Sequence, residues 1–133
     1  MFTDFEQVGE DYLKIKVDDE FHNDPCLDDR ALIVKTDKGL IVVLGCAHRC
    51  LINTLYHARE VTGEKQIYMV IGGCHLHDAS KELIAKTIDS LQEFDIQKIG
   101  VSHCTGLPAA SMMAAEFGDR FFFNTAGTSI TVD

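Results

Sequence analysis

The chain has 133 residues, 46% of them apolar and 25% charged, a length and balance typical of one globular domain. Its formal net charge of −9 argues against a nucleic-acid partner, because phosphate binding depends on lysine and arginine side chains that this surface lacks. No apolar run approaches the roughly 20 residues of a membrane helix, and the first residues are acidic where a signal peptide would be basic. We therefore expect a cytoplasmic protein that binds neither nucleic acid nor membrane.

The first 27 residues form an acidic segment with weak patterns. YLKIKV, residues 12–17, alternates like an edge strand. The following VDDEFHNDPCLDD is expected to be a solvated loop that contains His22. We treat the whole chain, 1–133, as a single domain in which 28–131 carries the readable fold.

Strand and helix patterns alternate from residue 31 onward. Two β-branched runs, 31–36 and 39–45, flank Asp37-Lys38-Gly39 and predict a hairpin. Further strands are expected over 66–73 and 97–102, and helices over 51–60, from a cap at Asp78 or Ser80 to about 91, and over 107–117. Gly63 and Gly118 are the expected helix stops, Pro108 suits a first helical turn, and 120–132 reads as two strands around a turn. This order predicts an α/β layer with a largely parallel sheet and one antiparallel element.

The odd number of cysteines, five, and the lack of an export signal argue against a complete disulfide framework. We expect reduced thiols that are mostly buried. Cys46, Cys74 and Cys104 follow strands at glycine- or serine-rich exits, where a small apolar side chain packs well. A zinc site of Cys46, His48 and Cys50 would need three ligands within five residues, which favours packing for Cys46.

Three strand ends carry a histidine next to or near a cysteine. GCAHRC contains His48, GGCHLHDAS contains His75 and His77, and SHCTG contains His103. Carboxyl ends of parallel strands meet at one edge of a sheet, where sites form. Imidazole is the commonest protein ligand for zinc and also suits iron. One such histidine would be interpreted as a hydrogen-bonded structural residue, but three together predict a metal site.

Two other histidines are interpreted as structural or solvated. His22 falls in the acidic segment, and His57 falls on a helix face. Neither follows a predicted strand of the main sheet.

The blocks DDRALIVKTDKGLIVVLGCAHRCLINTL, IYMVIGGCHL and SHCTG, followed later by NTAGTSI, resemble the C-terminal half of a metallo-β-lactamase-fold protein. The branch they are most similar to is the dihydropterin-ribofuranosylaminobenzene phosphate synthase-like one, over roughly residues 28 to 131. The resemblance implies half of an αββα sandwich, a mixed sheet with helices packed on one face, and a dinuclear metal site.

The resemblance also implies roles for individual residues. His48 of GCxH would bind the first metal, and His103 of HCTG would bind the second. His75 falls where other superfamily members place a bridging aspartate, so His75, His77 and Asp78 all stay open for the middle position. Thr105 and Gly106 would shape the loop that faces the substrate.

The chain departs from the family pattern in three places. The main metal motif of the superfamily, HxHxDH, does not occur in this sequence. Cys50 replaces a usual glycine, and Cys74 replaces the usual aromatic of GGFHL. The chain thus resembles a truncated enzyme.

Two functions of different classes follow. The chain would be the metal-binding half of a hydrolase or a pterin-related transferase, acting on a small molecule with a divalent metal, zinc first and iron or manganese as alternatives. A separate N-terminal-half polypeptide, an upstream segment or a second copy would supply the missing ligands. The alternative is a catalytically silent binding or assembly module, a homodimer through its sheet face. A redox role for Cys50 and Cys74 is a third hypothesis.

Overall fold

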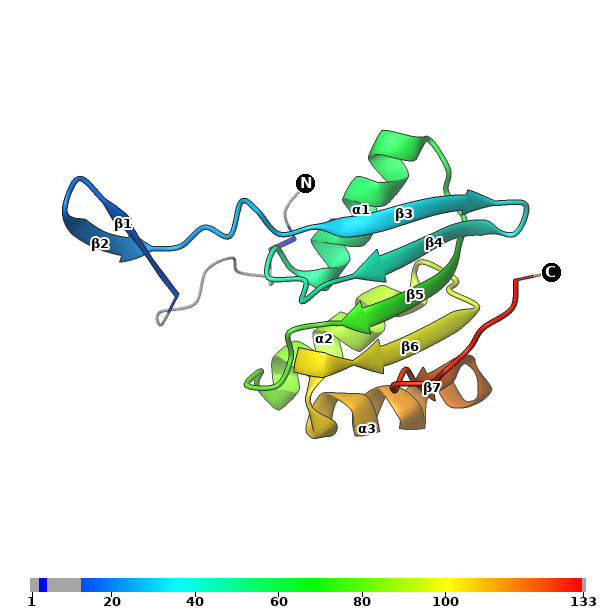
Figure 1. The fold of residues 1–133 in the computed structure, drawn as a ribbon. Helices are drawn as coiled ribbons and strands as arrows, with labels where there is room; N and C mark the ends of the chain where they lie inside the picture. The colour runs from blue at the N-terminus through cyan, green and yellow to red at the C-terminus, as the bar shows by residue number, and fades with distance from the viewer. Residues whose placement is uncertain (1–2, 5–12, 133) are drawn as a thin grey trace.

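The computed structural model describes residues 3–4 and 13–132 (Figure 1). Its strands and helices are, in chain order, β1 (Lys14–Val17), β2 (Glu20–Asn23), β3 (Ala31–Thr36), β4 (Gly39–Leu44), α1 (Leu51–Thr62), β5 (Ile67–Gly73), α2 (Lys81–Gln92), β6 (Lys98–Ser102), α3 (Leu107–Phe117) and β7 (Phe121–Phe123). Short 3-10 turns, η1 (His103–Thr105) and η2 (Gly118–Arg120), flank α3. Among the described residues, none of the helices has the length and apolar character needed to cross a bilayer.

The main sheet has the strand order β3-β4-β5-β6-β7. β3 and β4 form the predicted antiparallel hairpin, whereas β4, β5, β6 and β7 are parallel to their neighbours. Each parallel connection is a helix that leads to the adjacent strand, and right-handed crossovers of this kind place successive helices on the same face. Figure 1 shows α1 and α2 behind the sheet and α3 along its β6–β7 edge. The predicted mixed sheet with helices on one face is confirmed.

The hydrophobic core lies between the sheet and the helices. Alternate β4 side chains, including Leu40 and Val42, are fully buried there, as strand geometry requires of one face. They belong to one cluster with Ile84 of α2, Met113 of α3 and Leu55 of α1. Burial of these faces is what holds the helices to the sheet.

The other face of the sheet is also apolar, and none of the described helices packs on it. The pairing register puts Leu32 opposite Val43, Val34 opposite Ile41, and Val43 beside Ile71. We call these five residues the open sheet face. Leu32 is 63% exposed and Val34 is 40% exposed, in contrast to the core face of the same sheet. Such a face is the one that a second layer covers in an αββα sandwich.

The helix boundaries follow the predicted signals. α1 ends at Gly63, which has a left-handed φ of 68° and closes the helix by donating its N–H to the carbonyl of Arg59. Of the two predicted caps for α2, Ser80 is the one used, because its side chain accepts a hydrogen bond from the Leu83 amide at 3.2 Å. Pro108 lies in the first turn of α3, and Gly118 follows its end.

The predicted solvated loop after residue 17 was wrong, because it contains strand β2. Asp18 and Asp19 adopt φ values of 47° and 67°, which suit the tight turn of a two-residue hairpin. His22 therefore lies on an exposed strand opposite Ile15 rather than in a loop. β1 is not an edge of the main sheet either: it pairs with β2 in a separate two-stranded sheet that stands away from the main sheet (Figure 1).

The second strand predicted in the tail was also wrong. Only β7 forms, and residues 124–132 contain no strand. The chain turns directly after β7, where the Thr128 amide donates to the carbonyl of Thr125 at 3.0 Å. The Asn124 amide still donates to the carbonyl of Val101 in β6 at 2.9 Å, whereas the amides of Thr125 and Thr128 donate to carbonyls within the segment and its preceding strand.

Candidate metal centre

The loops that leave β4, β5 and β6 meet at one edge of the sheet. They meet because these strands are parallel neighbours, so their carboxyl ends lie together. Backbone hydrogen bonds join the loops: the Gly73 amide donates to the carbonyl of Gly45 at 3.1 Å, and the His77 amide donates to the carbonyl of Cys104 at 3.2 Å. All four histidines of these loops are thereby brought to the same edge.

Three of these histidines form a ring cluster, which we call the histidine cluster. The ring centroids of His48 and His75 are 4.2 Å apart, and those of His75 and His77 are 5.1 Å apart. The Nδ1 atom of His48 is buried and has no hydrogen-bond partner among the described residues. A buried ring nitrogen that lacks a protein partner is a donor atom suited to a ligand or an ion.

The fourth histidine belongs to a second group with two cysteines, which we call the thiol cluster. The ligand atoms of Cys46, His103 and Cys104 all lie within 4.8 Å of one another. His103 Nε2 is 3.1 Å from Cys46 Sγ, and the Cys104 thiol donates to the carbonyl oxygen of Cys46 at 3.4 Å. Sequence reasoning assigned both cysteines to packing. The signal that identifies them is the recurrence of cysteine near histidine after β4 and after β6, the two strands on either side of β5.

The structure thus divides the predicted trio. His48 and His75 are in contact, whereas the imidazole of His103 lies against Cys46. Of the three candidates for the middle position, His75 is the one whose ring contacts His48. His77 is more open, with 39% of its side chain exposed, and its Nε2 is 2.9 Å from the carboxylate of Asp78.

Burial keeps two of the nearby thiols protonated. Burial raises the pKa of Cys74 to about 12, even though Thr105 lowers it by hydrogen bonding. Burial likewise raises the pKa of Cys104 to about 11, against a hydrogen bond from the His75 backbone, and the neighbouring Cys46 raises it further. A sensor thiol needs a lowered pKa and access to solvent, so Cys74 does not have the properties of a redox sensor.

Backbone strain is concentrated in these loops. Eight described residues other than glycine have a positive φ, and four of them lie here: Ala47, Cys50, His75 and His103. This conformation is costly for residues with a Cβ and persists where the surrounding structure enforces it. The strained backbone therefore sets the direction of these side chains, including those of His75 and His103. In an unstrained loop they would point elsewhere.

Thr105 and Gly106 shape the loop between β6 and α3. Thr105 is buried, and its hydroxyl accepts from the Cys74 amide at 3.1 Å and donates to the carbonyl of Ser102 at 2.8 Å. Gly106 has a φ of 77°, and a Cβ there would lie 2.6 Å from the Cα of His77. Both residues therefore set how closely this loop approaches the neighbouring one.

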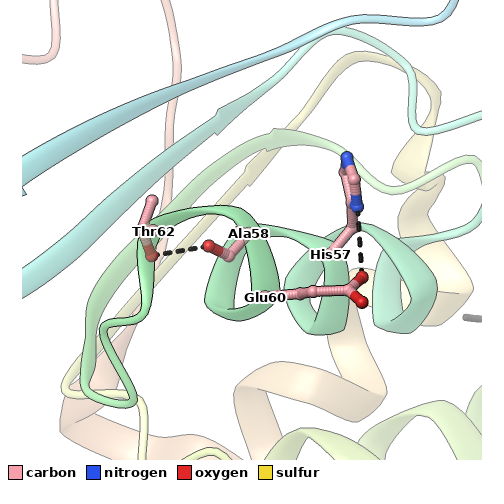
Figure 2. A network of polar contacts seen from close by, with 4 residues as sticks. All are labelled: His57, Ala58, Glu60 and Thr62. Carbon is pink, nitrogen blue, oxygen red and sulfur yellow. Dashed lines mark hydrogen bonds and ion pairs between the residues drawn. The ribbon is translucent and has the colours of Figure 1, made fainter.

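A hollow in the described surface is lined by none of the predicted ligands. A cavity of about 490 Å³ is lined by residues of β3, α1 and the segments beside them, among them Asp29, Arg49 and Asn53. His57 is also in its lining, on the exposed side of α1, where its Nδ1 is 3.7 Å from the carboxylate of Glu60 (Figure 2). His57 thus lies outside both clusters, as predicted.

Comparisons with known proteins agree with this architecture. No family model matches the sequence. A structural neighbour, a metal-dependent hydrolase of the β-lactamase superfamily, superimposes with a TM-score of 0.87 over 95% of this chain at 31% identity. A curated relative from Methanocaldococcus jannaschii is 39% identical over 94 residues, or 71% of this chain. That relative is a 7,8-dihydropterin-6-methyl-4-(beta-D-ribofuranosyl)-aminobenzene-5'-phosphate synthase.

The chain belongs to the metallo-β-lactamase superfamily. It spans 49% of the structural neighbour and 32% of the curated relative, so it holds about half of the metallo-β-lactamase fold. The side chains at its strand ends suit a divalent ion, because they combine imidazole nitrogens with thiols and leave the buried His48 Nδ1 without a partner among the described residues.

Proposed function

We propose that this chain is the metal-binding part of a metal-dependent hydrolase or transferase of the metallo-β-lactamase superfamily. The observation that carries the proposal is the convergence of three histidine-bearing loops at one sheet edge, with His48 and His75 in ring contact. Metal dependence of the neighbouring hydrolase, at 31% identity, supports it. The synthase activity of the curated relative supports a transferase that acts on a pterin-related small molecule.

His48, His75 and His103 are the residues proposed to hold the metal, with zinc as the first choice and iron or manganese as alternatives. The chemistry that such an ion supplies is Lewis-acid activation of water or orientation of a phosphate-bearing substrate. The chain's own contribution is positional: strained loops fix the imidazoles of His75 and His103, and the buried His48 Nδ1 is kept available. Thr105 and Gly106 shape the loop between β6 and α3, which would face the substrate.

Full activity requires ligands that this sequence does not carry, because HxHxDH is absent from it. A separate polypeptide, an upstream segment or a second copy of the chain would bring them. Two exposed apolar surfaces support a covering partner: the open sheet face, and the β1–β2 hairpin, where Phe21 is 72% exposed. Apolar surface of this extent is characteristic of an interaction site. Five reduced thiols support a reducing compartment such as the cytoplasm.

Reconstitution tests this function. The chain is co-expressed with an HxHxDH-bearing half of a metallo-β-lactamase-fold protein, and the complex is assayed for bound metal by elemental analysis and for phosphoester hydrolysis. We expect metal and activity in the complex, loss of both in His48→Ala, and retention of both in the matched variant His57→Ala. A stable complex that binds no metal would refute the proposal.

The alternative function is a catalytically silent assembly module, and the open sheet face is the observation that favours it. A two-fold dimer that buries this face on both copies would remove Leu32 and Val34 from water. Sedimentation equilibrium of the purified chain distinguishes the two functions. A dimer that binds no metal, alone or with the added half, supports the silent module, whereas a monomer excludes the dimer.

A further inference from the structure

We propose that Cys46, His103 and Cys104 form a zinc site distinct from the histidine cluster. This chain supplies all three ligands without a second polypeptide. The three ligand atoms come from two loops and lie within 4.8 Å of one another. Within that group, His103 Nε2 is 3.1 Å from Cys46 Sγ, so the imidazole nitrogen already faces the sulfur that would be its fellow ligand. This proposal goes beyond the proposed function, because it needs no HxHxDH half: His103 serves the thiol site in the isolated chain and would join His48 and His75 only when such a half is bound.

The distances suit tetrahedral zinc. Zinc binds thiolate at about 2.3 Å and imidazole at about 2.0–2.1 Å, which puts tetrahedral ligand atoms roughly 3.3–3.8 Å apart. The observed separations require shifts of about 1 Å or less at the side chains. Two sulfurs and one nitrogen make up a Cys2His set, which leaves the fourth position to a further ligand.

The backbone is arranged to bring these side chains together. A Cβ at Gly73 would lie 2.8 Å from Cys104 Sγ and 2.7 Å from the carbonyl oxygen of Gly45, so only glycine leaves room for the sulfur beside β5. His103 adopts a strained backbone conformation with a φ of 52°, and its ring lies against Cys46 in the loop after β4. The Cys104 thiol already donates to the carbonyl of Cys46, which holds the two loops in register.

Zinc binding deprotonates the two thiols of the site. One Zn–N bond and two Zn–S bonds form, and the two thiol protons pass to solvent. The hydrogen bond from the Cys104 thiol to the Cys46 carbonyl is given up in exchange. Because thiolates are soft ligands, the site should prefer zinc to manganese and magnesium, which select oxygen ligands.

Metal titration of the purified full-length chain tests the site. The protein is stripped with a chelator and titrated with Zn²⁺ by calorimetry and with Co²⁺ by absorption spectroscopy. We expect one ion per chain, with sulfur-to-cobalt charge-transfer bands, and no comparable binding of Mn²⁺. Cys46→Ser and Cys104→Ser should each weaken binding at least tenfold and reduce the bands, whereas Cys50→Ser and His57→Ala should change neither.

The controls keep this inference distinct from the proposed function. Loss of binding in His48→Ala, with wild-type affinity in both serine variants at positions 46 and 104, would overturn the thiol site and leave the histidine cluster as the metal site. If the serine variants fail to fold, alkylation of the wild-type chain decides, with labelled cysteines located by mass spectrometry. Zinc should protect Cys46 and Cys104 while Cys50 stays reactive. Equal labelling with and without zinc refutes the proposal.

Discussion

Replacement of Gly106 by alanine, in the β6–α3 loop, should lower the stability of the chain and weaken zinc binding at the candidate site. Gly106 has a φ of 77° and a ψ of 150°, a region that essentially only glycine occupies. The added Cβ would also lie 2.6 Å from the Cα and 2.9 Å from the Cβ of His77. Because the first of these is a backbone atom, the conflict is relieved only by moving one loop away from the other.

The expected cost has two parts. The unfavourable backbone conformation costs about 1–3 kcal/mol. Overpacking against His77 costs about 1–3 kcal/mol more. Their sum is a large fraction of the roughly 5–15 kcal/mol that stabilises a typical domain. The displaced loop should also weaken zinc binding about 10–100-fold, as is usual when the support of metal ligands is changed.

Urea unfolding and zinc calorimetry of Gly106→Ala measure both effects. Gly63→Ala is the matched control, because Gly63 also has a positive φ, 68°, but a Cβ there meets no atom within 4 Å. The control should lose only about 1–2 kcal/mol and keep wild-type zinc affinity. Equal stability and equal zinc affinity of the two variants would refute the reasoning, because the close approach to His77 would then have no energetic effect.

Three further variants test other parts of the structure. Thr105→Val should lower the free energy of unfolding by about 1–3 kcal/mol, because the buried Cys74 amide loses its acceptor. A urea midpoint equal to that of the wild type would contradict this. Leu32→Lys should leave the unfolding free energy within about 0.5 kcal/mol but reduce self-association in sedimentation, since the side chain is 63% exposed. Dimers of unchanged affinity would place the interface elsewhere. His57→Ala should alter neither stability nor zinc affinity beyond about 0.5 kcal/mol, because its contact with Glu60 is exposed, and a larger loss in calorimetry would show that α1 takes part in the site.

The sequence by itself determined the main sheet and its helices. The β-branched runs, the helical spacing of Ile84, Ile88 and Leu91, and the glycine stops are local signals, and tertiary packing agreed with them. The same local signals were misleading where strand pairing decides whether a strand forms. The tail lacks a second strand because its residues close a turn instead of pairing, and the acidic segment contains a strand because an Asp-Asp turn folds it back on β1.

The meeting of three histidine-bearing loops was also predictable, since the carboxyl ends of neighbouring parallel strands always share an edge. Which side chains meet at this edge was not predictable from the sequence. Ala47, His75 and His103 adopt left-handed backbone conformations that no local pattern encodes, and these conformations set where the side chains point. Only the tertiary structure could therefore place the His103 ring against Cys46, 57 residues away in the chain, and bring Cys104 beside them both.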